Sequence, residues 1–176
     1  MLERLWAGWR IPYVESADTP SPQAPQRDPS KSLFENIEQS GLPDEQTYVV
    51  HRGKRCFAIL NAFPYTSGHL MVMPKRAVAD LESLDDDEHE ELWALVRDAV
   101  VALKAAYRPD GVNVGINLGT AAGAGVPDHL HVHVLPRWIA DTNFTTTVAE
   151  MRVLPEALSS TWRKLVDAWP RDDSDR

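Results

Sequence analysis

Short apolar runs separated by turn residues fill the chain from about residue 47 onward. They lie at 48–51, 56–60, 69–74, 112–119 and 129–135, with a further candidate at 144–155. Runs of this length bounded by turn signals are typical of β-strands, and the Arg-Gly-Lys turn between the first two predicts a hairpin. We therefore expect an antiparallel sheet of about five strands.

Two other segments follow a helical period. Between 83 and 107 apolar residues recur every three or four positions, at Leu92, Val96, Ala99, Leu103 and Ala106. This spacing predicts one long helix inserted between strands, with acidic residues at its start favouring the positive end of the helix dipole. A second helix is predicted at 155–169, with proline in its first turn. Hairpin-connected strands with one inserted and one closing helix predict an α+β fold.

The domain organisation follows from these patterns. Residues 1–30 are predicted to be an extension, in which a short helix at 2–13 precedes a linker rich in proline and small polar residues. Residues 31–154 are expected to form the α+β domain, and 155–176 a helix and tail that pack on it. A chain of 176 residues is of ordinary size for one domain.

Composition excludes several classes of protein. The net charge of −8 argues against a general binder of nucleic acid or of a membrane surface. The one cysteine, Cys56, cannot form an intramolecular disulfide framework or, alone, a thiolate metal site. No apolar run is long enough to cross a membrane, and the N-terminus lacks the pattern of a signal peptide. We expect a cytoplasmic protein.

The most informative stretch is DHLHVHVLPRW at 128–138. Successive side chains of a strand point to opposite faces, so His129, His131 and His133 are expected to share one face and the intervening apolar residues the other. Apolar residues would fill the same positions at a lower desolvation cost, so three alternating histidines indicate a functional site.

Two uses of such histidines compete. Imidazoles can ligate zinc, or a neutral imidazole can attack phosphorus while its neighbours fix its tautomer and protonate the leaving group. The glycine-rich segment INLGTAAGAGVPD at 116–128 leads directly into the histidines. A loop of this kind can bring backbone N–H groups close to an anion, which favours phosphate.

The histidine pattern resembles the signature of the histidine triad (HIT) superfamily of nucleotide hydrolases and transferases. LNAFPYTSGHLMVMPKR, residues 60–76, is similar to the second signature of that family, and the resemblance spans about 47–144. RLWAGWRIPYV, NLGTAAGAGVPDHLHVHVLPRW and DTNF resemble the bacterial branch related to diadenosine tetraphosphate (Ap4A) phosphorylases. The resemblance implies a HIT-like fold and a homodimer or higher homo-oligomer.

The resemblance also implies roles for particular residues. His131 matches the nucleophile, His129 the residue that supports its orientation, and His133 a residue near the phosphate and the leaving oxygen. Asn61 matches a ribose-binding position and His69 a residue close to the triad. Asn117 lies at about the place of a phosphate-contacting amide. The backbone N–H groups of Gly123, Ala124 and Gly125 are expected to contact phosphate in place of polar side chains that relatives carry nearby, and Phe63 and Trp138 are possible pocket residues.

The sequence departs from its relatives at two places. Many carry a Cys-x-x-Cys and a histidine that hold zinc with a triad histidine, and here the matching positions are Ser32, Glu35 and Ala77. We therefore expect no metal and no other cofactor. Gly125 and Val126 also stand where several relatives place polar side chains that contact phosphate, which bears on whether water or phosphate is the acceptor.

These features predict an enzyme that cleaves dinucleoside polyphosphates at the α-phosphate through a covalent nucleotidyl-histidine, with phosphorolysis to ADP and ATP. Its expected partners are purine nucleotides or dinucleoside polyphosphates and inorganic phosphate. Three alternatives stay open. One is a HIT hydrolase that uses water on dinucleoside polyphosphates or nucleoside phosphoramidates. The second is a nucleotide-binding regulatory module, and the third a metal-dependent hydrolase.

Overall fold

The computed structural model describes residues 28–141 and 156–171. The helix predicted at 2–13, most of the proline-rich linker and the candidate strand at 144–155 lie outside these residues.

Five antiparallel strands form one sheet in the order β1-β2-β3-β5-β4. The strands are β1 Val49–Arg52, β2 Cys56–Leu60, β3 Leu70–Pro74, β4 Gly111–Ile116 and β5 Val132–Arg137. The first three follow one another as hairpins, whereas β5 enters between β3 and β4. The predicted α+β class and the antiparallel five-stranded sheet are confirmed. The insertion of β5 puts the histidine segment in the interior of the sheet.

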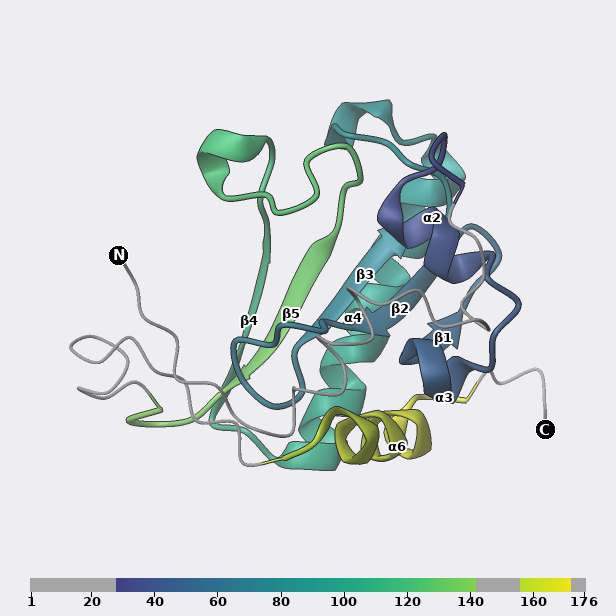
Figure 1. Cartoon of the computed structure of the whole chain (residues 1–176). Helices are drawn as coiled ribbons and strands as arrows, with labels where there is room; N and C mark the ends of the chain where they lie inside the picture. The colour runs from purple at the N-terminus through teal and green to yellow at the C-terminus, as the bar shows by residue number, and fades with distance from the viewer. Residues whose placement is uncertain (1–27, 142–155, 172–176) are drawn as a thin grey trace, which may run out of the picture.

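The long inserted helix, α4 Asp86–Tyr107, crosses one face of the sheet (Figure 1). It begins three residues later than the sequence predicts, because Asp85 forms a capping box in which its carboxylate accepts the N–H of Glu88. A short 3₁₀ turn, η2 Leu81–Ser83, precedes it. Leu92, Leu95, Ala99 and Leu103 of α4 pack on Ala58, Leu70, Val72, Val132 and Val134 of the sheet. This contact is the main hydrophobic core.

The closing helix, α6 Leu158–Ala168, packs on α4 and β1. The indole Nε1–H of Trp162 donates to the carbonyl of Val49 at 2.7 Å, and the ring of Trp169 stacks on His51 with 5.1 Å between centroids. These contacts attach the helix to the β1 edge of the sheet. None of the helices that the structure describes is long and apolar enough to span a membrane.

Two short helices precede the sheet: α2 Leu33–Glu38 and α3 Asp44–Thr47. The buried ring of Phe34 in α2 belongs to a second, smaller apolar cluster on the face opposite α4, with Val49, Phe57, Ile59, Met71 and Met73. The rings of His129 and His131 lie against Phe34 on this second face.

Candidate active site

The alternation predicted for the histidine segment holds, although the strand is shorter than expected. β5 begins at Val132, so of the three histidines only His133 lies within it. The backbone N–H groups of His129 and Leu130 bond outside the ladder: that of His129 donates to the carbonyl of Val126 at 3.3 Å, and that of Leu130 to the carbonyl of Val78 at 2.6 Å. Leu130, Val132 and Val134 nevertheless face the α4 core, and the three imidazoles face the other side.

All three imidazoles are buried: His129 is 0% exposed, His131 6% and His133 8%. The ring of Phe34 lies 5.4 Å, centroid to centroid, from the rings of both His129 and His131. The rings of His131 and His133 are 4.9 Å apart. Burial shields these rings from solvent, so the protein groups next to each ring determine which of its nitrogens carries hydrogen.

Two hydrogen bonds fix the tautomer of His129. Its Nε2 lies 2.8 Å from the carbonyl oxygen of Pro74, and a carbonyl only accepts, so Nε2 carries the hydrogen. Its Nδ1 lies 2.7 Å from Oγ of Ser32, which therefore donates to it. Burial, with the nearby His131 adding to it, lowers the pKa of His129, although the Pro74 carbonyl and Glu35 act in the opposite direction. His129 is thus held as a neutral imidazole.

His131 has the complementary tautomer. Its Nδ1 lies 2.7 Å from the backbone carbonyl of His129, so Nδ1 carries the hydrogen and donates it. In the neutral ring Nε2 then bears an unprotonated lone pair. An imidazole nitrogen in this state is a nucleophile, and the fixed Nδ1–H orients it.

A chain of hydrogen bonds determines which ring nitrogen of His133 carries hydrogen. The backbone N–H of Tyr65 donates to Nδ1 of His69 at 3.2 Å, so the hydrogen of the neutral His69 ring is on Nε2. This nitrogen lies 2.9 Å from Nδ1 of His133 and donates to it. The remaining hydrogen of His133 is therefore on Nε2. Burial and the adjacent His131 lower the pKa of His133 to about 4, so at neutral pH it is a neutral hydrogen-bond donor.

Asn61 and Asn117 reach the same region from two other strands. Asn61 follows β2 directly, and its N–H donates to the carbonyl of His69 at 2.9 Å. Its Oδ1 accepts the N–H of Phe63 at 2.8 Å, which shapes the turn. Asn117 follows β4, where the last residue, Ile116, pairs with Val132. The register thus places Asn117 at the strand end beside His131.

The glycine-rich segment forms a compact turn around η3 Thr120–Ala122. Gly119 and Gly123 have φ of 74° and 93°, a conformation that glycine adopts without strain. The N–H groups of Gly123 and Ala124 donate to the carbonyls of Thr120 and Gly119. Of the three N–H groups expected to meet phosphate, only that of Gly125 has no acceptor among the described residues.

The two possible pocket residues lie in different surroundings. Phe63 is 60% exposed and sits in the turn after Asn61. Trp138 packs edge-to-face on Tyr107, 6.4 Å between centroids, just past the end of β5. Five residues of extended chain, roughly 17 Å, separate it from His133.

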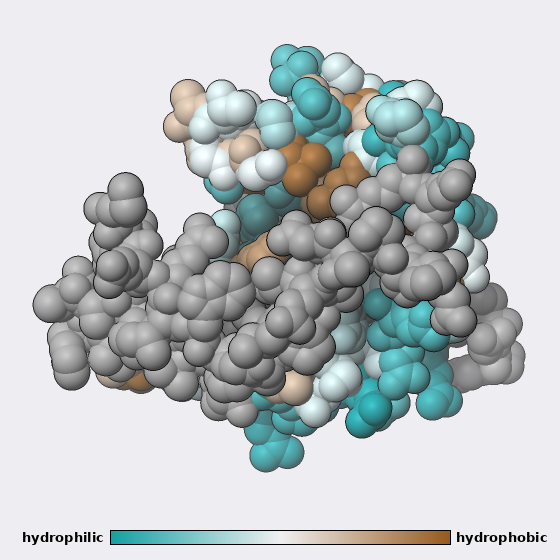
Figure 2. Space-filling model, viewed as in Figure 1, coloured by the Kyte–Doolittle hydropathy of each residue, from teal (hydrophilic) through white to brown (hydrophobic). Residues whose placement is uncertain are grey.

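Figure 2 shows a hollow between the loop before β5 at upper left and the α2 side at upper right, with apolar atoms beside it.

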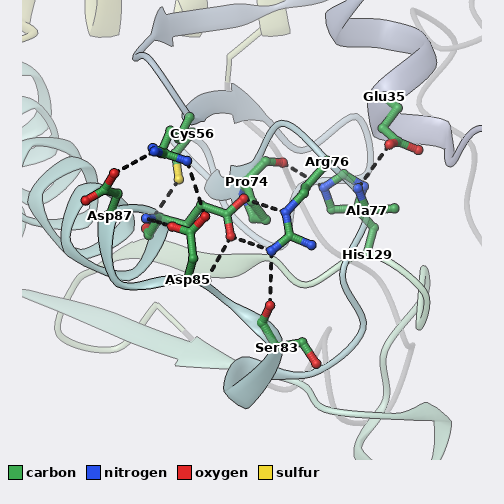
Figure 3. A network of polar contacts seen from close by, with 11 residues as sticks. Glu35, Cys56, Pro74, Arg76, Ala77, Ser83, Asp85, Asp87 and His129 are labelled. Carbon is green, nitrogen blue, oxygen red and sulfur yellow. Dashed lines mark hydrogen bonds and ion pairs between the residues drawn. The ribbon is translucent and has the colours of Figure 1, made fainter.

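Ser32, Glu35 and Ala77, the positions at which the sequence led us to expect no zinc ligands, lie close to His129. Ser32 bonds to its ring, and Oε1 of Glu35 accepts the N–H of Ala77 at 3.1 Å. Figure 3 shows His129 between the carbonyl of Pro74 and this Glu35–Ala77 pair. Within 28–141 and 156–171, His, Cys, Asp and Glu form no group of three or more suited to a metal.

Comparison with known proteins assigns the chain to a family. The family model described as HIT domain matches residues 43–138. The chain is 45% identical over 175 residues to a protein of Mycobacterium tuberculosis named AP-4-A phosphorylase, an alignment that covers 97% of this chain and 86% of that protein. The chain belongs to the HIT domain family.

More distant relatives share the same domain. The chain is 38% identical over 93 residues to the asymmetrical bis(5'-nucleosyl)-tetraphosphatase of Schizosaccharomyces pombe, covering 53% of this chain and 50% of that one. A solved structure of a Zn-bound histidine triad family protein from Mycobacterium smegmatis superimposes with a TM-score of 0.64 at 27% identity. That superposition covers 79% of this chain and 93% of the other.

The sequence predicted His69, the partner of His133, close to the triad, but not the other partners of the histidine rings. Tyr65 contributes through its backbone N–H and lays its ring 4.6 Å from that of His69. Pro74 contributes a carbonyl oxygen. Partners that act through the main chain cannot be recognised from the type of residue. Ser32 was noticed in the sequence only because it stands where relatives carry a cysteine.

Proposed function

We propose that the protein cleaves dinucleoside polyphosphates such as Ap4A at an α-phosphate through a nucleotidyl-His131 intermediate, and that inorganic phosphate accepts the nucleotidyl group to give ADP and ATP. The observation that carries the proposal is the tautomer of His131, whose Nδ1–H is bound by a carbonyl and whose Nε2 is left as a lone pair. The likeness to the mycobacterial AP-4-A phosphorylase over 97% of the chain supports the substrate and the acceptor.

In the first step the Nε2 lone pair of His131 attacks the α-phosphorus of Ap4A. The P–N bond forms as the P–O bond to the remaining triphosphate breaks, and ATP leaves with the electron pair of that bond. His131 becomes a phosphorylated imidazolium, and the carbonyl of His129 stabilises its Nδ1–H, 2.7 Å away. The Nε2–H of His133 donates to the phosphate or to the bridging oxygen that leaves.

In the second step an oxygen of inorganic phosphate attacks the same phosphorus from the side vacated by ATP. The P–N bond breaks and its electron pair returns to Nε2, so His131 regains its starting tautomer and ADP is released. Water in place of phosphate gives AMP. Both acceptors use the same groups of the chain, and the choice between them rests on how the glycine-rich turn holds the incoming oxygen.

Asn61, Asn117 and Gly125 are proposed to bind the substrate. Asn61 lies beside His69 and is assigned to the ribose, and the amide of Asn117 is assigned to the phosphate. Gly125 N–H is the backbone donor left for a phosphate oxygen, because those of Gly123 and Ala124 are used within the turn.

Two substitutions at Gly125 separate its N–H from its size. We expect Gly125→Pro, which removes the N–H, to lower kcat/KM for Ap4A by about 10-fold to 100-fold, the loss of one donor to a charged phosphate. Gly125→Ala keeps the N–H, and an added Cβ meets nothing within 4 Å, so it should stay within about 2-fold of wild type. Equal losses in steady-state assays of the two variants would remove this assignment.

The function is tested by incubating the protein with Ap4A with and without inorganic phosphate and separating the nucleotides. ADP and ATP formed only with phosphate establish the phosphorylase, and AMP and ATP formed without it establish an asymmetrical hydrolase, as the Schizosaccharomyces pombe relative is named. ADP alone without phosphate would contradict attack at the α-phosphorus. Nucleotide binding without turnover would favour a regulatory module, and loss of activity in chelator a metal-dependent hydrolase.

We also infer that the protein is a cytoplasmic homodimer or larger homo-oligomer. In the described sheet β4 pairs only with β5, so its other edge is open, and Val114 on it is 43% exposed. A second copy could cover this edge, which would protect an otherwise unpaired strand. The sedimentation coefficient of the purified protein distinguishes a dimer from a monomer.

A further inference from the structure

We propose that Ser32 is a positioning residue for the nucleophile: its hydroxyl fixes the tautomer of His129, and the carbonyl of His129 in turn aims Nε2 of His131. The inference rests on the proposed function, because it assigns Ser32 a part in the attack of His131. Ser32 touches neither substrate nor the reacting nitrogen, and acts through two successive hydrogen bonds of 2.7 Å each.

The direction of the first bond follows from the neutral ring of His129, whose Nε2 donates to the Pro74 carbonyl and whose Nδ1 can therefore only accept. Ser32 is the N-cap of α2, and its Oγ accepts the N–H of Glu35 at 3.1 Å. That bond uses one of the two lone pairs of the oxygen, so the hydroxyl hydrogen is still available to be donated to Nδ1 of His129, which is 2.7 Å away. One serine therefore caps the helix and supplies the hydrogen that the buried ring needs.

The hydroxyl determines which nitrogen of His129 is protonated. With Ser32 donating to Nδ1, the ring hydrogen is on Nε2 and is donated to the Pro74 carbonyl. A group at position 32 that only accepts would require a hydrogen on Nδ1. A neutral ring would then leave the Pro74 carbonyl facing a lone pair, and a doubly protonated ring would place a buried cation beside His131.

α2 holds Ser32 in place through contacts on both sides of the triad segment. The capping box closes when Oε2 of Glu35 accepts the N–H of Ser32 at 2.8 Å, and the other oxygen of Glu35 accepts the N–H of Ala77. Ala77 belongs to the stretch that supplies the Pro74 carbonyl to His129 and the Val78 carbonyl to Leu130. Phe34, between Ser32 and Glu35, packs on the rings of His129 and His131.

Ser32, Glu35 and Ala77 form one hydrogen-bonded unit beside His129. Here a hydroxyl and a carboxylate at positions 32 and 35 attach α2 to His129 and to the backbone of Ala77 by hydrogen bonds alone. We therefore infer that the orientation of the triad in this chain depends on the donor at position 32.

Two variants separate the hydrogen from the helix cap. Aspartate and threonine both cap helices, but at neutral pH only threonine can donate a hydrogen to His129. We expect Ser32→Asp to lower kcat for Ap4A by about 10-fold to 100-fold with KM within about 2-fold, the range typical of removing the partner of a functional histidine. Ser32→Thr should keep kcat within about 3-fold of wild type, since the hydroxyl donor remains.

Ring-nitrogen NMR of the ¹⁵N-histidine-labelled full chain gives a readout that does not depend on turnover. In wild type and Ser32→Thr the spectrum of His129 should show hydrogen on Nε2 only, and in Ser32→Asp on Nδ1 as well or instead. An unchanged His129 tautomer in Ser32→Asp, or equal kcat in the two variants, would overturn the proposal. A wild type that shows the expected tautomers without turning over Ap4A would instead contradict the proposed function.

Ser32→Ala serves as the second variant if Ser32→Asp does not give a folded protein. It removes both the cap and the donor but introduces no acceptor, and the Pro74 carbonyl still holds Nε2–H of His129. Its kcat should therefore fall, by less than expected for the aspartate, with the threonine variant again close to wild type. If Ser32→Ala folds and keeps the kcat of wild type, Ser32 has no part in positioning His131.

Discussion

Replacing His131 by alanine is expected to lower kcat for Ap4A by 10⁴-fold or more, on the order of what removal of a nucleophile costs other covalent enzymes. The loss follows because the unprotonated nitrogens of the other two triad rings already accept hydrogen bonds: Nδ1 of His129 accepts from Ser32, and Nδ1 of His133 accepts from His69. Rapid-quench assays with radiolabelled Ap4A should show a protein-bound nucleotide in wild type and none in the variant.

A glycine at the same position gives a sharper version of this experiment. His131→Gly leaves a ring-sized space in which free imidazole can lie near the carbonyl of His129 and attack the α-phosphorus in place of the side chain. We expect added imidazole to restore measurable turnover in His131→Gly, and to do nothing for His133→Gly. Full activity of His131→Ala would show that the reaction does not pass through this residue.

The second large effect is a loss of stability in acid. The pKa of His133 is about 4 in the folded protein and 6.5 for the free side chain. A group whose pKa is lowered by folding contributes stability above its unfolded pKa, and that contribution is lost as the pH falls through the folded pKa. The difference corresponds to roughly 3 kcal/mol of unfolding free energy, lost from about pH 6.5 to below pH 4.

Urea unfolding at pH 7.0, 5.5 and 4.5 measures this loss. His133→Gln removes the titrating ring, so its unfolding free energy should fall less steeply with acidity than that of wild type. His89→Gln, on an exposed part of α4, is the matched control and should follow the wild-type slope. Identical slopes for wild type and His133→Gln would mean that His133 is not held neutral by burial.

The sequence predicted the fold because its signals are local. Alternating and helical spacing depend on neighbours within a few residues, and the pattern from Leu130 to Val134 placed the imidazoles opposite the core even though β5 starts only at Val132. The helix α4 was predicted to begin at residue 83 but begins at Asp86, because Asp85 is its N-cap and closes a capping box with Glu88.

The chemical state of the site could not be predicted in this way. Which ring nitrogen carries hydrogen depends on Pro74, 55 residues before His129, and on Ser32, 97 residues before it. The glycine-rich turn shows the same limit, since its composition suggested three N–H donors and its folded form uses those of Gly123 and Ala124 internally.

Three of the bonds that orient the triad come from the main chain: the carbonyls of Pro74 and His129 and the N–H of Tyr65. A substitution changes a side chain and leaves these groups in place, provided that the replacement at Tyr65 is not proline. The orientation of the His131 ring should therefore be unchanged by most single-residue substitutions in a mutational scan. Ser32 is the exception in the path to the nucleophile, so position 32 should tolerate far fewer residue types than its half-buried place at a helix end would suggest.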